Sequence, residues 1–477
     1  MATTRKFQVG FFSKKSMGLV LGLGALLVMP FLSLPDLSPA GHVALGIFVM
    51  ASVFWILEPI PIYATSMGVI LAQVLLLSDQ NLIKPWWEAQ YEGGYQPPAY
   101  TDFYNTLANP IIILFLGGFS LAAAAEKYAL DRNLTRIMLK PFGQRPANVA
   151  LGVMMVTGVL SAFMSNTATT AMMMTVAIPI VARVPVDDPF RRLVALSIPV
   201  GANIGGIATP IGTPPNAVAL AALARQGTLV PFSTWMLLAT PLVVVTLLLS
   251  WWGMCRMFPP GIRTFTLTID SKFQRSSKAI CCYLIFALTV GLWVTEKLHG
   301  IPSGVVAFIP VVLLPALGVL DKKEIRGFSW EVLWLVAGGI SLGLSLRQTG
   351  LAEWMISRVS WENFSTTGLV VLFGLVGFAV ANLVSHTVSA TILVPIAIAL
   401  VLPQAGGDTT ALIIPIAIIG IIVSYSMILP ISTPPNAIAL STGLIETRDL
   451  AKAGWLVGIL GFVFTVLFGL LLWPLLL

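Results

Sequence analysis

Long apolar stretches alternate with short polar segments along the chain, from residues 17–34 to residues 455–477. The stretches are about 20 residues long, the length that a helix needs to cross the hydrocarbon core of a membrane. Basic residues precede the first stretch, as in a signal peptide, but further stretches follow at once, so we interpret it as a span. The pattern predicts an all-α polytopic membrane protein. About eleven transmembrane helices are expected, near 17–34, 42–58, 62–78, 109–126, 190–226, 231–255, 279–298, 301–319, 330–350, 409–442 and 453–477.

Four of the apolar segments contain polar or proline-rich interruptions. They are Ser165-Asn166-Thr167, Ser385-His386-Thr387, Gly212-Thr213-Pro214-Pro215-Asn216 and Ser432-Thr433-Pro434-Pro435-Asn436. Two consecutive prolines cannot continue a helix, because they lack N–H donors and clash with the preceding turn. They are well placed at the start of a new half-helix. The two Thr-Pro-Pro segments therefore predict helices that are broken within the membrane.

The interruptions recur at a nearly constant spacing. The segment "LFLGGFSLAAA" (114–124) matches "LVAGGISLGLS" (335–345) at an offset of 221 residues. The two hydroxyl-rich clusters match at an offset of 220, and so do the two Thr-Pro-Pro segments. Three matches in the same order predict an internal repeat. Interrupted segments at matching positions of two halves are a pointer to the substrate site of a transporter.

Composition and charge agree with a membrane protein and give it an orientation. The chain is 57% hydrophobic and 10% charged, whereas soluble proteins carry about 25% charged residues. Of the 27 Lys and Arg residues, 22 lie in six segments: the N-terminus, 127–145, 183–192, 256–278, 322–326 and 448–452. The positive-inside rule places these segments in the cytoplasm. The net charge of +7 is thereby explained without nucleic acid, and we expect a cytoplasmic N-terminus and an external C-terminus.

Two apolar segments, 147–182 and 367–403, begin and end on the same side under this orientation. Each is either two poor spans or a re-entrant hairpin, and the polar residues at its middle favour a hairpin, because irregular backbone at membrane depth must be buried or line a wet cavity. The hairpins would enter from opposite faces, which makes the repeat an inverted one. The predicted organisation is 1–108, N-terminal scaffold spans; 109–257, first repeat with hairpin 147–182 and broken helix 190–226; 258–329, cytoplasmic loop and connecting spans; 330–477, second repeat with hairpin 367–403 and broken helix 409–442.

The interruptions offer ligands for an anion and for a cation together. Carbonyls before a helix break lose their partners, and the half-helix after the break presents its positive end. Neither Lys nor Arg stands in the four motifs, so an anion would be held by neutral donors and helix N-termini. Bound cations would supply the missing positive charge. This is a physical reason to expect ion-coupled anion transport.

With these motifs, the chain resembles the divalent anion/sodium symporter family, the superfamily of dicarboxylate, citrate and sulfate carriers. The resemblance rests on the paired hairpin tips and the Thr-Pro-Pro breaks, and it covers nearly the whole chain. It implies a homodimer that moves its substrate by an elevator mechanism, with a scaffold and a mobile transport domain in each protomer. It also implies sodium as the coupling ion and no organic cofactor.

The resemblance further implies roles for individual residues. The substrate-binding residues would be Ser165, Asn166, Thr167, Thr213, Pro214, Ser385, His386, Thr387, Thr433 and Pro434. The first sodium site would consist of Ser161, Ser165, Asn166 and the carbonyl of Gly212. A second sodium site would draw on Ser385, His386 and Ser432.

The second half departs from the family pattern. His386 stands where Asn is expected, Ala381 replaces a hydroxyl counterpart of Ser161, and Ser432 replaces the equivalent of Gly212. These departures bear on the second sodium site and on the number of coupled ions. His386 has two interpretations: it donates a ring N–H to substrate in place of Asn, or it titrates and makes transport proton-sensitive.

We therefore expect a sodium-coupled carrier of a small divalent anion, a C4-dicarboxylate such as succinate or malate, in a bacterial cytoplasmic membrane. The alternative within the family is a phosphate or sulfate carrier, because Ser-His-Thr resembles the second motif of yeast low-affinity phosphate carriers. A channel would share the same site chemistry. An intramembrane enzyme is disfavoured, because neither Ser165 nor Ser385 has the context of an activated nucleophile. Three histidines and three cysteines provide no metal or disulfide framework.

Overall fold

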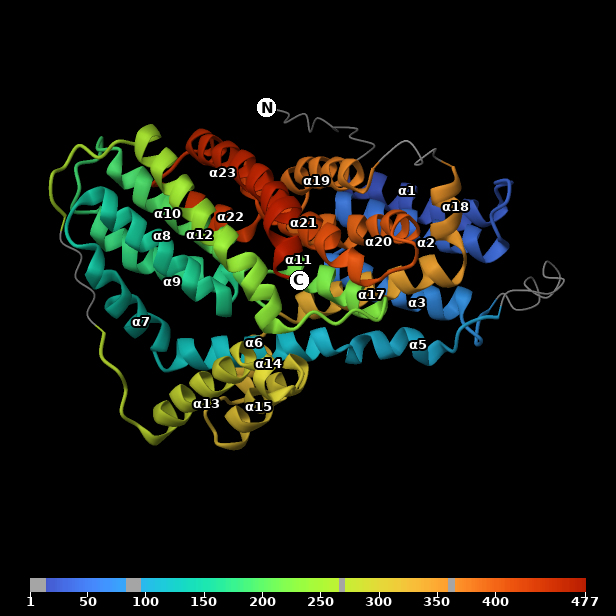
Figure 1. Ribbon diagram of the computed structural model, residues 1–477, viewed down its shortest axis with the longest axis horizontal. Helices are drawn as coiled ribbons and strands as arrows, with labels where there is room; N and C mark the ends of the chain where they lie inside the picture. The colour runs from blue at the N-terminus through green and yellow to red at the C-terminus, as the bar shows by residue number, and fades with distance from the viewer. Residues whose placement is uncertain (1–13, 83–95, 266–270, 359–364) are drawn as a thin grey trace, which may run out of the picture. The chain divides into compact units, whose positions relative to one another are not determined.

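The computed structural model describes residues 14–82, 96–265, 271–358 and 365–477. Within these ranges the secondary structure is entirely helical, with no strand, which confirms the predicted all-α fold (Figure 1). The basic residues before Lys14 lie outside the described ranges, as do residues 83–95, 266–270 and 359–364. The helices form two compact units, 1–107 with 337–360 and 108–336 with 361–477.

Nine helices in the described ranges are long and apolar enough to cross a membrane. They include three arms of the predicted hairpins, Pro146–Phe163, Thr366–Leu383 and His386–Gln404. Shorter apolar helices occur at Ile62–Leu77, Ser303–Ala316 and Thr410–Ser424. The nine helices differ from the predicted set of eleven in two ways. Three hairpin arms are added, and five predicted spans are absent from the nine: the broken segments 190–226 and 409–442 and the unbroken helices Ile62–Leu77, Ser303–Ala316 and Trp330–Gln348.

The first unit contains α1 (Lys14–Val28), α2 (Pro39–Leu57), α3 (Ile62–Leu77), α5 (Tyr100–Tyr104), most of α17 (Trp330–Gln348) and α18 (Leu351–Ser357). A buried amide joins α3 to α17 inside this unit. Gln73 Nε2 donates to the Ser341 carbonyl at 2.9 Å and to Ser345 Oγ at 2.8 Å. The Gln73 side-chain oxygen accepts from Ser341 Oγ at 2.5 Å. Buried polar groups stabilise a helix pair only when they are paired in this way.

The second unit holds the remaining helices. They are α6 (Pro110–Lys127), α7 (Leu130–Leu139), α8 (Pro146–Phe163), α9 (Asn166–Val181), α10 (Phe190–Gly205), α11 (Pro214–Arg225), α12 (Phe232–Met257), α13 (Ser277–Val294), α14 (Glu296–His299), α15 (Ser303–Ala316), α16 (Lys322–Arg326), α19 (Thr366–Leu383), α20 (His386–Gln404), α21 (Ile413–Ser424), α22 (Pro434–Ser441) and α23 (Thr447–Leu467). Figure 1 shows α6, α13 and α15 packed together, and α8 beside α10.

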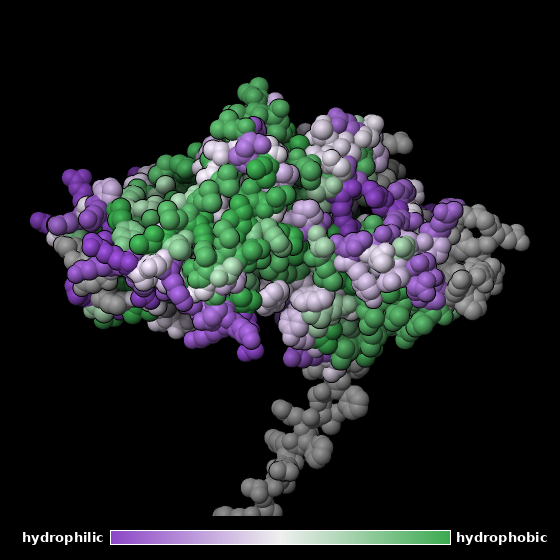
Figure 2. Space-filling view, turned by 90° about the horizontal axis from the view of Figure 1, so that it is seen from below, coloured by the Kyte–Doolittle hydropathy of each residue, from purple (hydrophilic) through white to green (hydrophobic). Residues whose placement is uncertain are grey.

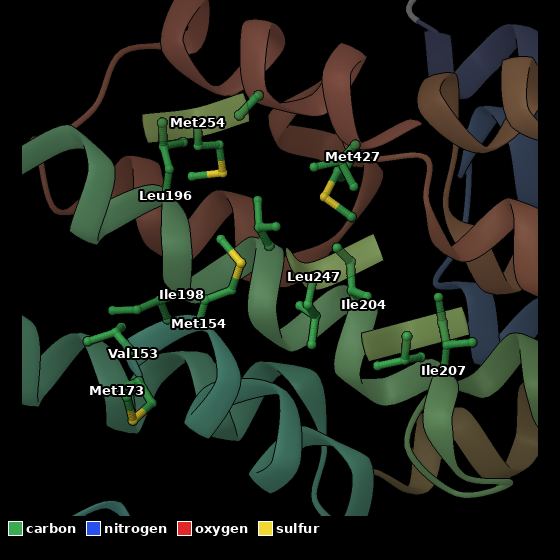
Figure 3. Packing of buried hydrophobic residues seen from close by; sticks show 14 of the residues in the cluster. Val153, Met154, Met173, Leu196, Ile198, Ile204, Ile207, Leu247, Met254 and Met427 are labelled. Atoms are coloured by element: carbon green, nitrogen blue, oxygen red, sulfur yellow. The ribbon is translucent and has the colours of Figure 1, made fainter. Parts of the chain in front are cut away.

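The core of the second unit is built from aliphatic and methionine side chains. Met154 of α8, Ile198 of α10 and Leu247 of α12 belong to one buried cluster (Figure 3). At its other end the same cluster includes Ile207 and Met427, which come from the two interrupted segments. The breaks are therefore anchored in a close-packed interior, in which lost volume is costly.

Large apolar side chains also remain exposed on this unit, among them Leu284, Val305, Ile459 and Leu471. Hydrophobic residues cover broad areas of the surface seen in Figure 2. Exposed apolar area of this extent is expected where lipid chains replace water as the solvent. The chain is thus an integral membrane protein.

Glycines allow α8 and α10 to approach each other closely. A Cβ on Gly205 would overlap the backbone of Gly158, and one on Gly201 would overlap the carbonyl of Met154. Small residues at contacts of this kind are the usual basis of helix packing in membranes. The contact matters for function because α10 leads directly into the first break.

We expect Gly205→Ala to destabilise the protein by about 1–3 kcal/mol, the range for overpacking a tight interior. The control is Gly291→Ala in α13, where a Cβ would have no neighbour within 4 Å. Thermal unfolding of the detergent-solubilised protein measures both variants. Equal midpoints for the two variants would contradict the close packing of α8 on α10.

Candidate functional site

Both hydroxyl-rich clusters lie at sharp breaks between two contacting helices. In the first cluster α8 ends at Phe163 and α9 begins at Asn166, and Ser165 Oγ accepts from the Ala168 N–H at 3.1 Å. Ser165 and Asn166 are half-buried, and Thr167 is exposed. The clusters therefore form the N-terminal ends of helices, where unpaired backbone N–H groups attract anions.

The second cluster repeats this arrangement. Helix α19 ends at Leu383 and α20 begins at His386, and Ser385 Oγ accepts from the Val388 N–H at 3.3 Å. Ser385 and Thr387 are half-buried, while His386 is buried. Each helix pair, α8–α9 and α19–α20, therefore contributes one helix N-terminus that is capped by a serine side chain.

The first Thr-Pro-Pro segment follows a true gap in a helix. After α10 a short 3-10 turn covers Gly206–Ala208, and α11 begins at Pro214. The buried Asn216 amide nitrogen donates to three carbonyls of this gap: Gly206 at 3.3 Å, Ile207 at 3.1 Å and Thr209 at 2.8 Å. The amide thereby pairs backbone groups that the break leaves without helical partners.

The second Thr-Pro-Pro segment uses the equivalent amide. Between α21 and α22, Asn436 Nδ2 donates to the carbonyls of Met427 at 3.0 Å and Leu429 at 3.1 Å. Thr213 and Thr433 occupy the N-cap positions of α11 and α22, but neither hydroxyl caps its own helix. Each hydroxyl can therefore bind a group outside its own helix.

The breaks of the two halves come into direct contact within the second unit. Thr433 Oγ1 donates to Asn203 Oδ1 at 3.0 Å, and Asn203 Nδ2 lies 3.5 Å from Asn436 Oδ1. Helix α22 packs on α9 and α10, and α11 packs on α20 and α21. Each half-helix therefore crosses to the opposite half, so both breaks and both hairpin tips belong to one assembly.

Oxygen atoms gather around the side chain of Asn166. One terminal atom of its amide lies 2.6 Å from Ser161 Oγ, 2.9 Å from the Gly212 carbonyl oxygen and 3.2 Å from the Ala202 carbonyl oxygen. A nitrogen at this position donates to all three oxygens, and this is the orientation that satisfies the amide. Rotation of the amide would place its oxygen there instead and complete a cluster of four. Such a cluster is the ligand type that hard cations bind. A Cβ on Gly206 would overlap the Asn166 amide, which explains why glycine stands there.

The corresponding place in the second half has different chemistry. His386 Nε2 lies 2.6 Å from the carbonyl oxygen of Ser426, so this nitrogen carries the proton and donates. Ser432 Oγ donates to the Leu429 carbonyl at 2.8 Å. The two halves share a backbone plan and differ in the donors and acceptors that face the break.

Sequence reasoning missed several residues of this assembly. Asn216 and Asn436 recur at the common offset of 220, so the repeat indicates that they have matching roles. Each amide donates to carbonyls of its own break. Asn203 gave no such signal, because its counterpart is Val423. The Ala202 carbonyl is a backbone group and is invisible to side-chain patterns.

A cavity of about 210 Å³ lies beside the end of α8 and is lined by Asp131, Leu134, Leu160 and Phe163 among others. Burial raises the pKa of the Asp131 carboxyl to about 6. Its oxygen accepts from the Arg132 backbone N–H at 2.7 Å, which favours the charged form but does not offset desolvation. The rest of the lining is apolar, and the described ranges contain no cluster of three His, Cys, Asp or Glu residues for a metal.

An all-helical membrane fold in which paired, interrupted helices meet is the architecture of secondary transporters. Comparison with known proteins places the chain more narrowly. The family model described as "sodium:sulfate symporter transmembrane region" matches residues 13–477. The chain therefore belongs to this family.

Named relatives and a solved structure agree with this assignment. The chain is 28% identical to the sodium-dependent dicarboxylate transporter SdcS of Staphylococcus saprophyticus, over 94% of this chain and 90% of the relative. It is also 28% identical to SdcS of Staphylococcus aureus strain USA300, over 96% and 91%. The crystal structure of the Alcanivorax borkumensis YdaH transporter matches 86% of this chain and 97% of its own, with a TM-score of 0.58 at 14% identity. This structural similarity shows a shared fold only.

We expect Asn216→Ala to destabilise the protein by about 1–3 kcal/mol, since it removes the amide donor that three buried carbonyls of the first gap share. Asn148→Ala, a half-buried position in α8, serves as the matched control and is expected to stay close to the native midpoint. Thermal unfolding of the two purified variants gives the comparison. If Asn216→Ala and Asn148→Ala unfold at the same temperature, the Asn216 amide does not stabilise the gap.

Proposed function

We propose that the protein is a secondary active transporter that carries a small divalent anion, a C4-dicarboxylate such as succinate or malate, coupled to sodium. The single observation that supports this most is the gathering of three oxygens, from Ser161, Ala202 and Gly212, around the amide of Asn166, which lies at the N-terminus of α9. A cation ligand and an anion-attracting helix end thus share one residue. The dicarboxylate assignment follows the two staphylococcal relatives, whose names give a sodium-dependent dicarboxylate transporter.

The cation is assigned to Ser161 Oγ, the Asn166 side-chain oxygen and the Gly212 carbonyl, with Ser165 beside them. The Ala202 carbonyl, 3.2 Å from the Asn166 amide atom, is added to this set. All are neutral oxygens in a buried or half-buried place. Sodium is the cargo here, and it brings positive charge to a region that has no basic side chain of its own.

The anion is assigned to the helix ends beside this cation. Ser165, Thr167, Ser385 and Thr387 offer hydroxyl and backbone donors at the starts of α9 and α20. Thr213 and Thr433 stand at the starts of α11 and α22, which Pro214 and Pro434 begin. Thr213 offers its hydroxyl, whereas the Thr433 hydroxyl reaches an anion only by leaving Asn203 Oδ1. Neutral donors hold an anion without a permanent charge that would trap it.

Coupling follows from charge. A divalent anion that leaves water for a site with only neutral donors pays a large desolvation cost. A cation bound at Asn166 offsets part of this cost, because the same residue starts the helix that faces the anion. Sodium therefore binds before the anion or together with it, and neither crosses productively alone.

We propose the same topology, orientation and oligomeric state that the sequence predicts. Hairpins α8–α9 and α19–α20 enter from opposite faces, with the N-terminus cytoplasmic and the C-terminus outside. The protein works as a homodimer by an elevator mechanism in a bacterial inner membrane, in line with its bacterial relatives. A phosphate or sulfate carrier is the second candidate, supported by the family description and by His386 in the second motif.

The test is uptake of labelled succinate, phosphate and sulfate into proteoliposomes with and without an inward sodium gradient. We expect succinate uptake that depends on sodium, saturates with substrate and shows counterflow. Asn166→Ala is expected to lower sodium-driven uptake by about 10–100-fold, the effect of losing roughly 1.5–3 kcal/mol at a charged ligand. Asn148→Ala is the control and should transport as the native chain does.

The outcomes separate the candidates. Uptake of phosphate or sulfate without succinate would move the assignment to the second candidate. Succinate uptake that is identical in sodium and in choline would refute the coupling. Conduction without saturation or counterflow would indicate a channel.

A further inference from the structure

The inverted repeat places Asn166 and His386 at equivalent positions. Each directs a nitrogen at a carbonyl oxygen of its break, but only the amide can turn to present an oxygen instead. An amide presents an oxygen or a nitrogen according to its partners. The His386 ring nitrogen next to the Ser426 carbonyl has one role only, because a carbonyl accepts and cannot donate. At 2.6 Å the Nε2–H therefore points at an oxygen of the second break.

The surroundings of His386 fix this arrangement. The side chain is only 6% exposed and is held between α20, to which it belongs, and the segment after α21. Ser426 is itself tied down, since its Oγ donates to the Phe378 carbonyl at 3.1 Å. The packing around the ring therefore holds His386 Nε2 next to the Ser426 carbonyl.

The remaining oxygens of the second break are also engaged. Asn382 Oδ1 accepts from the Ile428 N–H at 2.8 Å, and the Asn382 carbonyl lies 3.3 Å from Ser432 Oγ, which donates to the Leu429 carbonyl at 2.8 Å. Ala381 provides no hydroxyl where the first half has Ser161. The second half thus lacks both the hydroxyl of Ser161 and an amide whose oxygen could turn toward a cation.

We propose that the His386 N–H takes the place of a cation in the second half. The N–H supplies a fixed partial positive charge to the Ser426 carbonyl. The transport site formed by the two halves then binds one sodium ion instead of two. This inference rests on the proposed function, because it concerns the ion count of the same transport site. It replaces the second sodium site expected at Ser385, His386 and Ser432.

The consequence is an asymmetric site. In the first half the positive charge is exchangeable and comes from solution, whereas in the second half it is built into the protein. Loss of sodium therefore weakens only the first half of the anion site. The sodium dependence of transport reports this directly, because it counts the ions that bind cooperatively.

The experiment measures initial succinate uptake in proteoliposomes against sodium concentration. For the native chain we expect a Hill coefficient of about 1. The double variant Ala381→Ser/His386→Asn restores the hydroxyl and amide of the first half, and its coefficient is expected to rise toward about 2. His299→Asn is the matched control, since His299 Nε2 also lies close to a carbonyl, that of Leu292 at 2.8 Å, but outside the repeat motifs. Its coefficient should equal that of the native chain.

A native coefficient of two or more overturns the inference, and so does a double variant that transports with an unchanged coefficient. If the double variant does not fold, the native coefficient decides alone. A native chain with succinate uptake but no sodium effect would instead refute the proposed coupling on which the inference rests. The two failures are therefore distinguishable.

Discussion

The structure of the site depends on one constraint: backbone groups that leave a helix at membrane depth must find partners other than water. Each break exposes several carbonyls, and in both halves the amide two residues after the first proline binds some of them, Asn216 in the first half and Asn436 in the second. These amides hold the gaps open in a defined shape. The carbonyl of Gly212 then lies next to Asn166 because the gap that carries it is fixed.

The same constraint accounts for the link between the halves. Half-helices α11 and α22 are too short to span, so each packs on helices of the other half. The hydrogen bond from Thr433 to Asn203 joins a break of one half to the helix before the break of the other. A change at one break would therefore reach the other, as the proposed joint binding of cation and anion requires.

The fold was largely predictable, whereas the details of the site were not. Apolar stretches, consecutive prolines and hydroxyl clusters are local signals, and the constant offset between the halves made them a repeat. The contacts of Asn203 and Ser426 depend on residues 230 and 40 positions away in the chain, and neither has a mark in the local pattern. His386 departs from the symmetry of the repeat, but only the position of its Nε2 gives the direction of its hydrogen bond. Backbone groups such as the Ala202 carbonyl leave no trace in the sequence at all.

The central claim is that a cation bound by the oxygens around Asn166 makes the anion site competent. Equilibrium binding of labelled succinate to the purified protein, measured at increasing sodium with choline to keep ionic strength constant, tests it most directly. The account predicts that succinate affinity rises with sodium and that binding is lost when choline replaces sodium completely. Equal affinity for succinate in sodium and in choline would contradict it.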